Sequence, residues 1–164
     1  MSEGTRRPSV RTLVAAAALL AVAAGVVEHL LVSPEEEIQA VVDALVQAVE
    51  REDRPAVEAL LLDPADFSGP HPIRSGDRTA MLRGLELLGE KTRELQYISR
   101  APEVRIAGRS ASHTSEGLIR FKWGDALVVH RAKIEITLMK DAPDCPEGWC
   151  VRRVDVLELR RGFR

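Results

Sequence analysis

The apolar residues change their spacing partway along the chain, and this change limits the fold more than any other feature. Before Ala101-Pro102 they recur at steps of three and four residues, which is typical of helices with one buried face. After Pro102 they alternate with charged residues, which is typical of strands with one face in solvent. Helices followed by consecutive antiparallel strands predict an α+β domain in which the helices cover one face of a curved sheet.

Three helices are predicted before this change in spacing. Ser33-Pro34 is a strong helix start, because a hydroxyl group caps the first turn and proline fits the first helical position. Acidic residues follow at once, where the helix dipole favours negative charge. Residues 63–77 hold several prolines and glycines and are expected to form an ordered loop or an edge segment. The predicted helices are residues 34–51, 53–63 and 77–95, with Asp77 or Thr79 as the cap of the third.

The second half of the chain is expected to form a run of antiparallel strands. Gly124-Asp125 is a hairpin turn signal between two alternating segments. Along residues 128–138, Arg131, Lys133 and Glu135 alternate with apolar residues and are therefore expected to face solvent. The predicted strands lie around residues 104–106, 119–123, 128–138 and 151–159.

The start of the chain differs in character from the rest. Residues 1–11 contain three arginines, and residues 12–27 carry no charge. A basic flank before an apolar run is typical of both a membrane anchor and a secretory signal. Counted through Val32, the run is long enough to span a bilayer. Counted to Val27, it is a signal core with a small-residue cleavage site at residues 21–23.

These features divide the chain into a basic cytoplasmic flank (1–11), a transmembrane anchor or signal segment (12–32) and one folded domain (33–164). Because the basic side of such a segment stays in the cytoplasm, the folded domain is expected outside it. The domain is then either tethered to the membrane through residues 12–32, or secreted or periplasmic after cleavage of the signal.

The charge distribution and the motifs exclude several classes of function. The net charge is −2, and the basic residues are spread among acids, which argues against nucleic-acid binding. The sequence lacks a glycine-rich phosphate loop and a nucleophile elbow. Its histidines lack the spacing of a metal site, and two cysteines alone do not complete a zinc site. We therefore predict no metal and no cofactor.

The two cysteines are predicted to form a disulfide. Cys145 and Cys150 flank a turn between the last two predicted strands, so the hairpin itself brings them close. An oxidising compartment outside the cytoplasm favours the bond.

The order of elements and two segments resemble the NTF2-like (SnoaL-like) superfamily. The segments are ALVQAVEREDRPAVEALL at residues 44–61, as the helix-turn-helix opening, and GWCVRRVDV at residues 148–156, as the last strand. The resemblance covers about residues 35–160 and implies a cone with a pocket, built from three helices on a curved antiparallel sheet. It implies no particular reaction, because the superfamily contains isomerases, dehydratases and non-catalytic binding domains. Residues 34–50 lack the tyrosine that the ketosteroid isomerases place on their first helix.

Two histidines fall on the inward phase of predicted strands. His113 shares its phase with Phe121 and Trp123, and His130 shares its phase with the apolar residues of its own strand. A carboxylate beside a buried imidazole suits general acid/base chemistry. The candidate catalytic residues are therefore His113, His130 and Asp155, with Glu158 as the alternative carboxylate, and Tyr97, Phe121 and Trp123 are the candidate pocket-lining residues. The alternative interpretation is that both histidines are structural.

The sequence thus predicts an exported, membrane-anchored NTF2-like domain that binds or assembles without catalysing a reaction. The alternative is a small-molecule lyase or isomerase that uses the pocket histidines. The candidate partners are the membrane through residues 12–32, a small apolar ligand, another protein, and a second copy of the chain bound through the sheet face.

Overall fold

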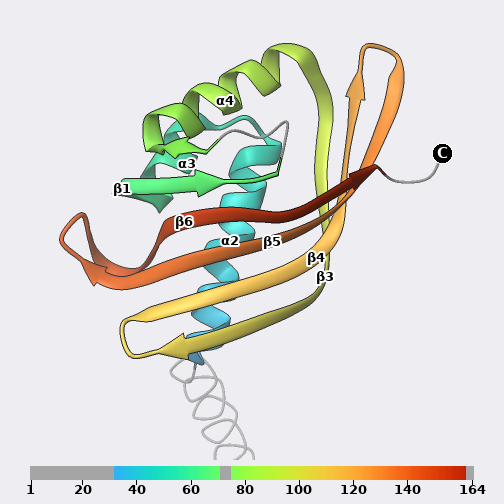
Figure 1. Cartoon of the computed structure of the whole chain (residues 1–164). Helices are drawn as coiled ribbons and strands as arrows, with labels where there is room; N and C mark the ends of the chain where they lie inside the picture. The colour runs from blue at the N-terminus through green and yellow to red at the C-terminus, as the bar shows by residue number, and fades with distance from the viewer. Residues whose placement is uncertain (1–31, 71–74, 162–164) are drawn as a thin grey trace, which may run out of the picture. The chain divides into compact units, whose positions relative to one another are not determined.

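The chain divides into two units, residues 1–33 and residues 34–164. The computed structural model describes residues 32–70 and 75–161 (Figure 1). The predicted anchor or signal segment therefore lies almost entirely outside the described residues. Among the helices of the described part, none has both the length and the apolar character that a bilayer span requires.

The three predicted helices are present, although the second and the third are shorter than predicted, since a strand, β1 (Leu61–Ser68), already begins at Leu61. They are α2 (Pro34–Glu50), α3 (Arg54–Leu60) and α4 (Arg78–Lys91). The Asp53 side chain caps α3, and the Asp77 side chain caps α4 by accepting a hydrogen bond from the backbone of Ala80. The prediction that α4 continues through Leu95 is wrong, because the backbone becomes extended at Thr92.

Within the described residues, six strands form one mixed sheet in the order β2-β1-β6-β5-β4-β3. The strands are β1 (Leu61–Ser68), β2 (Gly76–Asp77), β3 (Thr92–Ala107), β4 (Ser110–Trp123), β5 (Ala126–Ala142) and β6 (Cys145–Arg161). The prediction of a purely antiparallel sheet is wrong, because β1 pairs in parallel with β6. Both β1 and β2 come mainly from the segment expected to be a loop or an edge, and their backbone groups pair at the edge of the sheet.

The core lies between the sheet and the helices. We call the face of the sheet that packs against the helices the inner face, and the opposite face the outer face. In Figure 1, α2 runs across the inner face of the long strands. Its apolar residues recur at three- and four-residue steps and are buried there: Ile38, Val42, Leu45 and Ala48. From the sheet they meet Ala111, Ile136, Leu138, Trp149 and Val151.

The first turn of α2 is attached to the hairpin between β5 and β6. Trp149 is 5% exposed, and its Nε1 donates a hydrogen bond of 3.2 Å to Glu37 Oε2. Lys140 Nζ lies 3.1 Å from the same carboxylate oxygen and 5.6 Å from the centre of the Trp149 ring. Glu37 therefore stabilises the helix start by its charge and also fixes where the helix meets the sheet.

The hairpin is closed by the predicted disulfide. Cys145 and Cys150 are bonded, with their Cα atoms 6.2 Å apart. Both residues are buried beside Leu62 of β1 and Ala142 of β5, in a small apolar cluster separate from the main core.

Gly117 allows Tyr97 of the neighbouring strand to lie flat against β4. A Cβ atom at position 117 would stand 2.5 Å from the carbonyl oxygen of Ile98 and 2.7 Å from the Tyr97 ring. On the free side of β3, the backbone N–H of Tyr97 donates a hydrogen bond of 2.7 Å to Glu50 Oε1. The end of α2 therefore protects part of the edge strand from pairing with another chain.

Gly117→Ala is expected to lower the free energy of unfolding by about 1–3 kcal/mol, because the new methyl group would collide with backbone as well as with a ring. Gly84→Ala is the matched control, since nothing lies within 4 Å of a Cβ there. It should raise the stability by about 1 kcal/mol, because alanine favours a helix interior. Chemical denaturation measures both changes, and equal effects of the two variants would contradict the expected clash.

Replacing Cys145 and Cys150 together by Ser should lower the free energy of unfolding by about 2 kcal/mol without preventing folding, because the closed loop is short. Protein isolated from its native cells under alkylating conditions should contain no free thiol, as expected for an oxidising compartment. Mass spectrometry reads this out, and two alkylated cysteines would count against both the bond and the export that it suggests.

Candidate functional site

His113 lies on the inner face of β4 and is 1% exposed. Its Nε2 is 3.0 Å from Gln39 Oε1 on α2, and Gln39 Nε2 donates a hydrogen bond of 2.8 Å to Asp43 Oδ1. Because the Gln39 amide group already donates to Asp43, its oxygen is the acceptor, and His113 Nε2 must carry the proton. Among the described residues, His113 Nδ1 has no hydrogen-bond partner.

Burial lowers the pKa of His113, and this effect outweighs both a contact with its own backbone and the negative charge of Asp43. The imidazole is therefore neutral at neutral pH. A neutral ring fits its surroundings, since Val104 and Ile136 are its cross-strand neighbours. Sequence reasoning did not single out Gln39 and Asp43, although both lie on α2 one helical turn apart.

His130 also lies on the inner face, but far from His113 along the sheet. The cross-strand partner of His113 is Ile136, six residues from His130 on β5, which corresponds to roughly 20 Å along the strand. Ala132 and Ile134 fill the inner face between the two positions, and both pack in the interior. The His130 ring stacks on Phe121, with ring centres 6.1 Å apart. The structure therefore does not bring the two imidazoles together.

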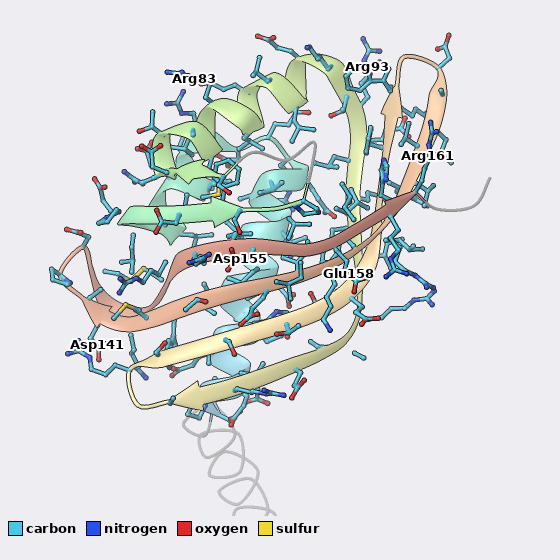
Figure 2. The ribbon with its side chains drawn as sticks, in the orientation of Figure 1. Arg83, Arg93, Asp141, Asp155, Glu158 and Arg161 are labelled. Carbon is cyan, nitrogen blue, oxygen red and sulfur yellow. A yellow bond between two sulfur atoms is a disulfide. The ribbon has the colours of Figure 1, made fainter. Side chains whose placement is uncertain are left out.

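Asp155 lies on the outer face, away from both histidines. Its cross-strand partner on β5 is Glu135, and its carboxylate accepts hydrogen bonds from Ser68 and from Arg153. Two bulges on β6 produce this placement. At each of them, one before Val154 and one at Leu157, β6 has one residue more than β5, so the alternation of its side chains between the two faces is interrupted. Glu158, the alternative carboxylate (labelled in Figure 2), is the cross-strand partner of Lys133 on the same outer face.

The three candidate pocket-lining aromatic residues occupy the inner face but do not surround one cavity with His113. The Tyr97 hydroxyl group lies 2.9 Å from Ser115 Oγ, and burial raises the pKa of this tyrosine. Phe121 is stacked on His130, and Trp123 is 53% exposed at the end of β4. His71, in the segment expected to be a loop or an edge, lies outside the described residues. Within the described ranges, no three His, Cys, Asp or Glu side chains gather as metal ligands would.

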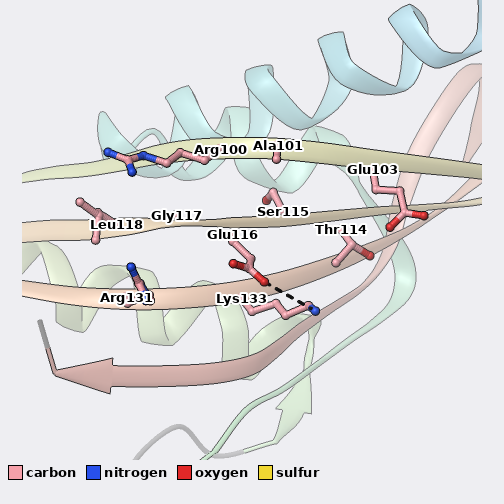
Figure 3. A pocket seen from close by; sticks show the side chains of 10 residues that line it. All are labelled: Arg100, Ala101, Glu103, Thr114, Ser115, Glu116, Gly117, Leu118, Arg131 and Lys133. Carbon is pink, nitrogen blue, oxygen red and sulfur yellow. Dashed lines mark ion pairs between the residues drawn. The ribbon is translucent and has the colours of Figure 1, made fainter.

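A hollow of about 490 Å³ opens on the outer face, over strands β3, β4 and β5. Figure 3 shows its charged side chains on the side of the sheet away from the helices. A smaller hollow of about 100 Å³ adjoins it and extends to Glu158 and Arg160 on β6. The larger one is lined by Arg100, Ala101, Glu103, Thr114, Ser115, Glu116, Gly117, Leu118, Arg131 and Lys133.

The hollow lies where β3 departs from regular pairing. The register with β4 shifts between Arg100 and Glu103, and Ala101 has a positive φ of 45°. The bulge widens the space over β4 on the outer face. The change in spacing at Ala101-Pro102 predicted a boundary between helix and strand there, and not a bulge within one long strand.

Solved structures with a similar fold support the resemblance to NTF2-like proteins. A conserved protein from Planctomyces limnophilus has a TM-score of 0.69 at 15% identity, with 78% of this chain and 97% of that chain covered. An NTF2-like protein from Cytophaga hutchinsonii has a TM-score of 0.63 at 13% identity, with 78% and 98% covered. A ketosteroid isomerase-like protein from Erwinia carotovora atroseptica has a TM-score of 0.59 at 20% identity, with 73% and 92% covered.

At these identities the likeness concerns the fold. No protein-family model matches the sequence, and a search of curated proteins finds no match. Residues 34–70 and 75–161 therefore share the α+β fold of NTF2-like proteins, and a fold of this kind does not by itself assign a reaction or a ligand.

His113→Gln is expected to flatten the dependence of stability on pH below neutrality. Because the pKa of His113 is lowered in the folded state, the unfolded chain takes up the proton first as the pH falls below about 6.5. The free energy of unfolding of the wild-type protein should therefore fall progressively below that pH and should lose nothing from His113 above it. Denaturation at pH 7.5 and pH 5 measures the difference, and an identical slope in the variant would show that His113 does not cause it.

Proposed function

We propose that this protein is an exported, membrane-anchored binding module that recognises a partner through the outer face of its sheet and catalyses no reaction. The observation that carries the proposal is the separation of the acid/base candidates. His113 is packed in the core, His130 lies roughly 20 Å away along the sheet, and Asp155 is on the opposite face. General acid/base chemistry requires groups that reach one substrate together.

The outer face has the features of a binding surface. Its hollow joins charged and apolar side chains from three strands, and the exposed apolar residue Ile98 is the cross-strand neighbour of Leu118, which lines the hollow. Protein interfaces commonly combine charged groups at the rim with apolar contacts. The helices that the structure describes lie on the other side of the sheet (Figure 1), so a partner would meet a broad sheet surface.

Two features support the export of the domain. The arginines of residues 1–11 precede the apolar run, so the positive-inside rule favours a domain outside the cytoplasm. The Cys145–Cys150 disulfide suits an oxidising compartment. Anchoring through residues 12–32 follows from the length of the apolar run, with cleavage of a signal as the alternative.

A small-molecule lyase or isomerase is the second candidate function. The unpartnered Nδ1 of His113 favours it, because a buried neutral imidazole with a free nitrogen can act as a base. However, the ring is 1% exposed, and a base must reach the proton that it removes. The binding function is therefore preferred.

Photo-cross-linking of the full-length protein in its native cells tests the binding surface. A photoreactive amino acid at Ile98, which is 42% exposed on β3, should give cross-linked products. The same group at Leu87, which is 50% exposed on α4, is the matched control and should give few. A product of twice the mass would identify a second copy as the partner. Products from Leu87 alone, or from neither position, would contradict the proposed surface.

A further inference from the structure

One row of side chains on the outer face alternates in charge across four strands. Arg100 on β3 lies opposite Glu116 on β4, Glu116 lies opposite Lys133 on β5, and Lys133 lies opposite Glu158 on β6. Opposite charges on neighbouring strands attract one another. This row crosses the hollow, so each acidic side chain in the row lies next to a basic side chain of the same protein.

The acidic residues around the hollow are engaged, whereas two of its arginines are not. The ion pairs are Glu116–Lys133 at 3.8 Å, Glu103–Arg105 at 2.7 Å and Glu158–Arg160 at 3.0 Å. In the part of the chain that the structure describes, Arg100 and Arg131 have no ion-pair partner. Both side chains are exposed and line the hollow, so their charges are available to a ligand.

Arg100 and Arg131 stand on either side of Leu118. Arg131 is the direct cross-strand neighbour of Leu118, and Arg100 lies one row away on the other side of β4. Strand spacing and rise put their Cα atoms roughly 12 Å apart, which two arginine side chains can bridge by converging on one group. Figure 3 shows the two side chains flanking Leu118. Two guanidinium groups converging in this way fit a carboxylate.

Two apolar side chains, Leu118 and Ile98, lie between and beside the arginines, next to Glu116. Leu118 is half-buried at the floor, and its cross-strand neighbour Ile98 is 42% exposed. An anionic group bound by the arginines would therefore have an apolar contact next to it. The hollow is open to solvent on a broad sheet face, whereas small-molecule sites enclose most of the ligand. A protein segment fits this geometry better, because it makes further contacts around the hollow.

We propose that this hollow binds a partner protein through a segment that presents a carboxylate beside an apolar side chain. The carboxylate lies between Arg100 and Arg131, and the apolar side chain packs on Leu118 and Ile98. This inference rests on the proposed function, which makes the outer face the binding surface, and it adds the chemistry that the partner must carry.

Glu116 sets the selectivity of the hollow. It lies in the row next to Leu118 and opposite Arg100, so its charge opposes an incoming carboxylate while Lys133 compensates it in part. Glu116→Gln should therefore strengthen the binding of an acidic segment severalfold. It should leave the binding of a neutral segment unchanged, because an uncharged peptide does not sense the lost charge.

Peptide binding to the full-length protein in detergent tests the inference by fluorescence anisotropy. The probe is a labelled, blocked tetrapeptide, Glu-Leu-Glu-Leu, and its neutral counterpart is Gln-Leu-Gln-Leu. The acidic peptide should bind about tenfold more tightly than the neutral one, and Arg100→Gln with Arg131→Gln should remove this difference. A higher salt concentration should weaken the binding of the acidic peptide and leave the binding of the neutral peptide unchanged.

The control variant is Arg83→Gln with Arg93→Gln, which removes the same charge from α4 and from the start of β3 (Figure 2). It should leave the tenfold preference intact, and the melting temperatures of both double variants should match the wild type because all four arginines are exposed. Equal binding of the two peptides, no binding of either, or an unchanged preference in the Arg100/Arg131 variant would each overturn the inference.

The cross-links from Ile98 separate this inference from the proposed function. If they persist at full yield in the Arg100/Arg131 variant, the outer face binds a partner but not through a carboxylate. If the protein with both arginines gives no cross-links from Ile98, the proposal that the outer face is the binding surface is itself wrong. Cross-links that disappear in the Arg100/Arg131 variant and persist in the Arg83/Arg93 variant support both.

Discussion

The burial of one face of the long strands beneath α2 is the interaction on which the rest of the structure depends. Four apolar residues of this helix, from Ile38 to Ala48, are almost fully removed from solvent, and each buried large side chain contributes about 1.5–3 kcal/mol. A sheet with one covered face needs a fixed register, because a slip of one residue would exchange its two faces. The hydrogen bond from Trp149 to Glu37 fixes where the start of this helix meets the hairpin between β5 and β6.

Covering the inner face decides what the polar groups can do. A buried polar side chain requires a partner, so His113 is held by Gln39 and Tyr97 by Ser115, in places where packing leaves little access for a substrate. The outer face has no such constraint. Charged residues there remain hydrated, pair across strands, and leave Arg100 and Arg131 available. The same alternation of the strands that builds the core therefore also assembles the proposed binding surface.

Several parts of the structure could be predicted from the sequence because their signals are local. Ser33-Pro34 and Asp77 mark helix starts, and Cys145 and Cys150 lie at the two sides of a single turn. The end of α4 could not be predicted, since Leu95 continues the helical spacing although the backbone is already extended from Thr92. The parallel pairing of β1 with β6 joins segments far apart in the chain, and their local composition does not record it.

By itself, the sequence determined the α+β order and the inward phase of His113 and His130, because both follow from the spacing of apolar residues along single elements. Only the tertiary structure decided which side chains meet. Register placed His130 six residues from the partner of His113, and the bulges of β6 turned Asp155 to the outer face. A bulge depends on how two strands pair across the sheet, so it leaves little trace in the pattern of either strand alone.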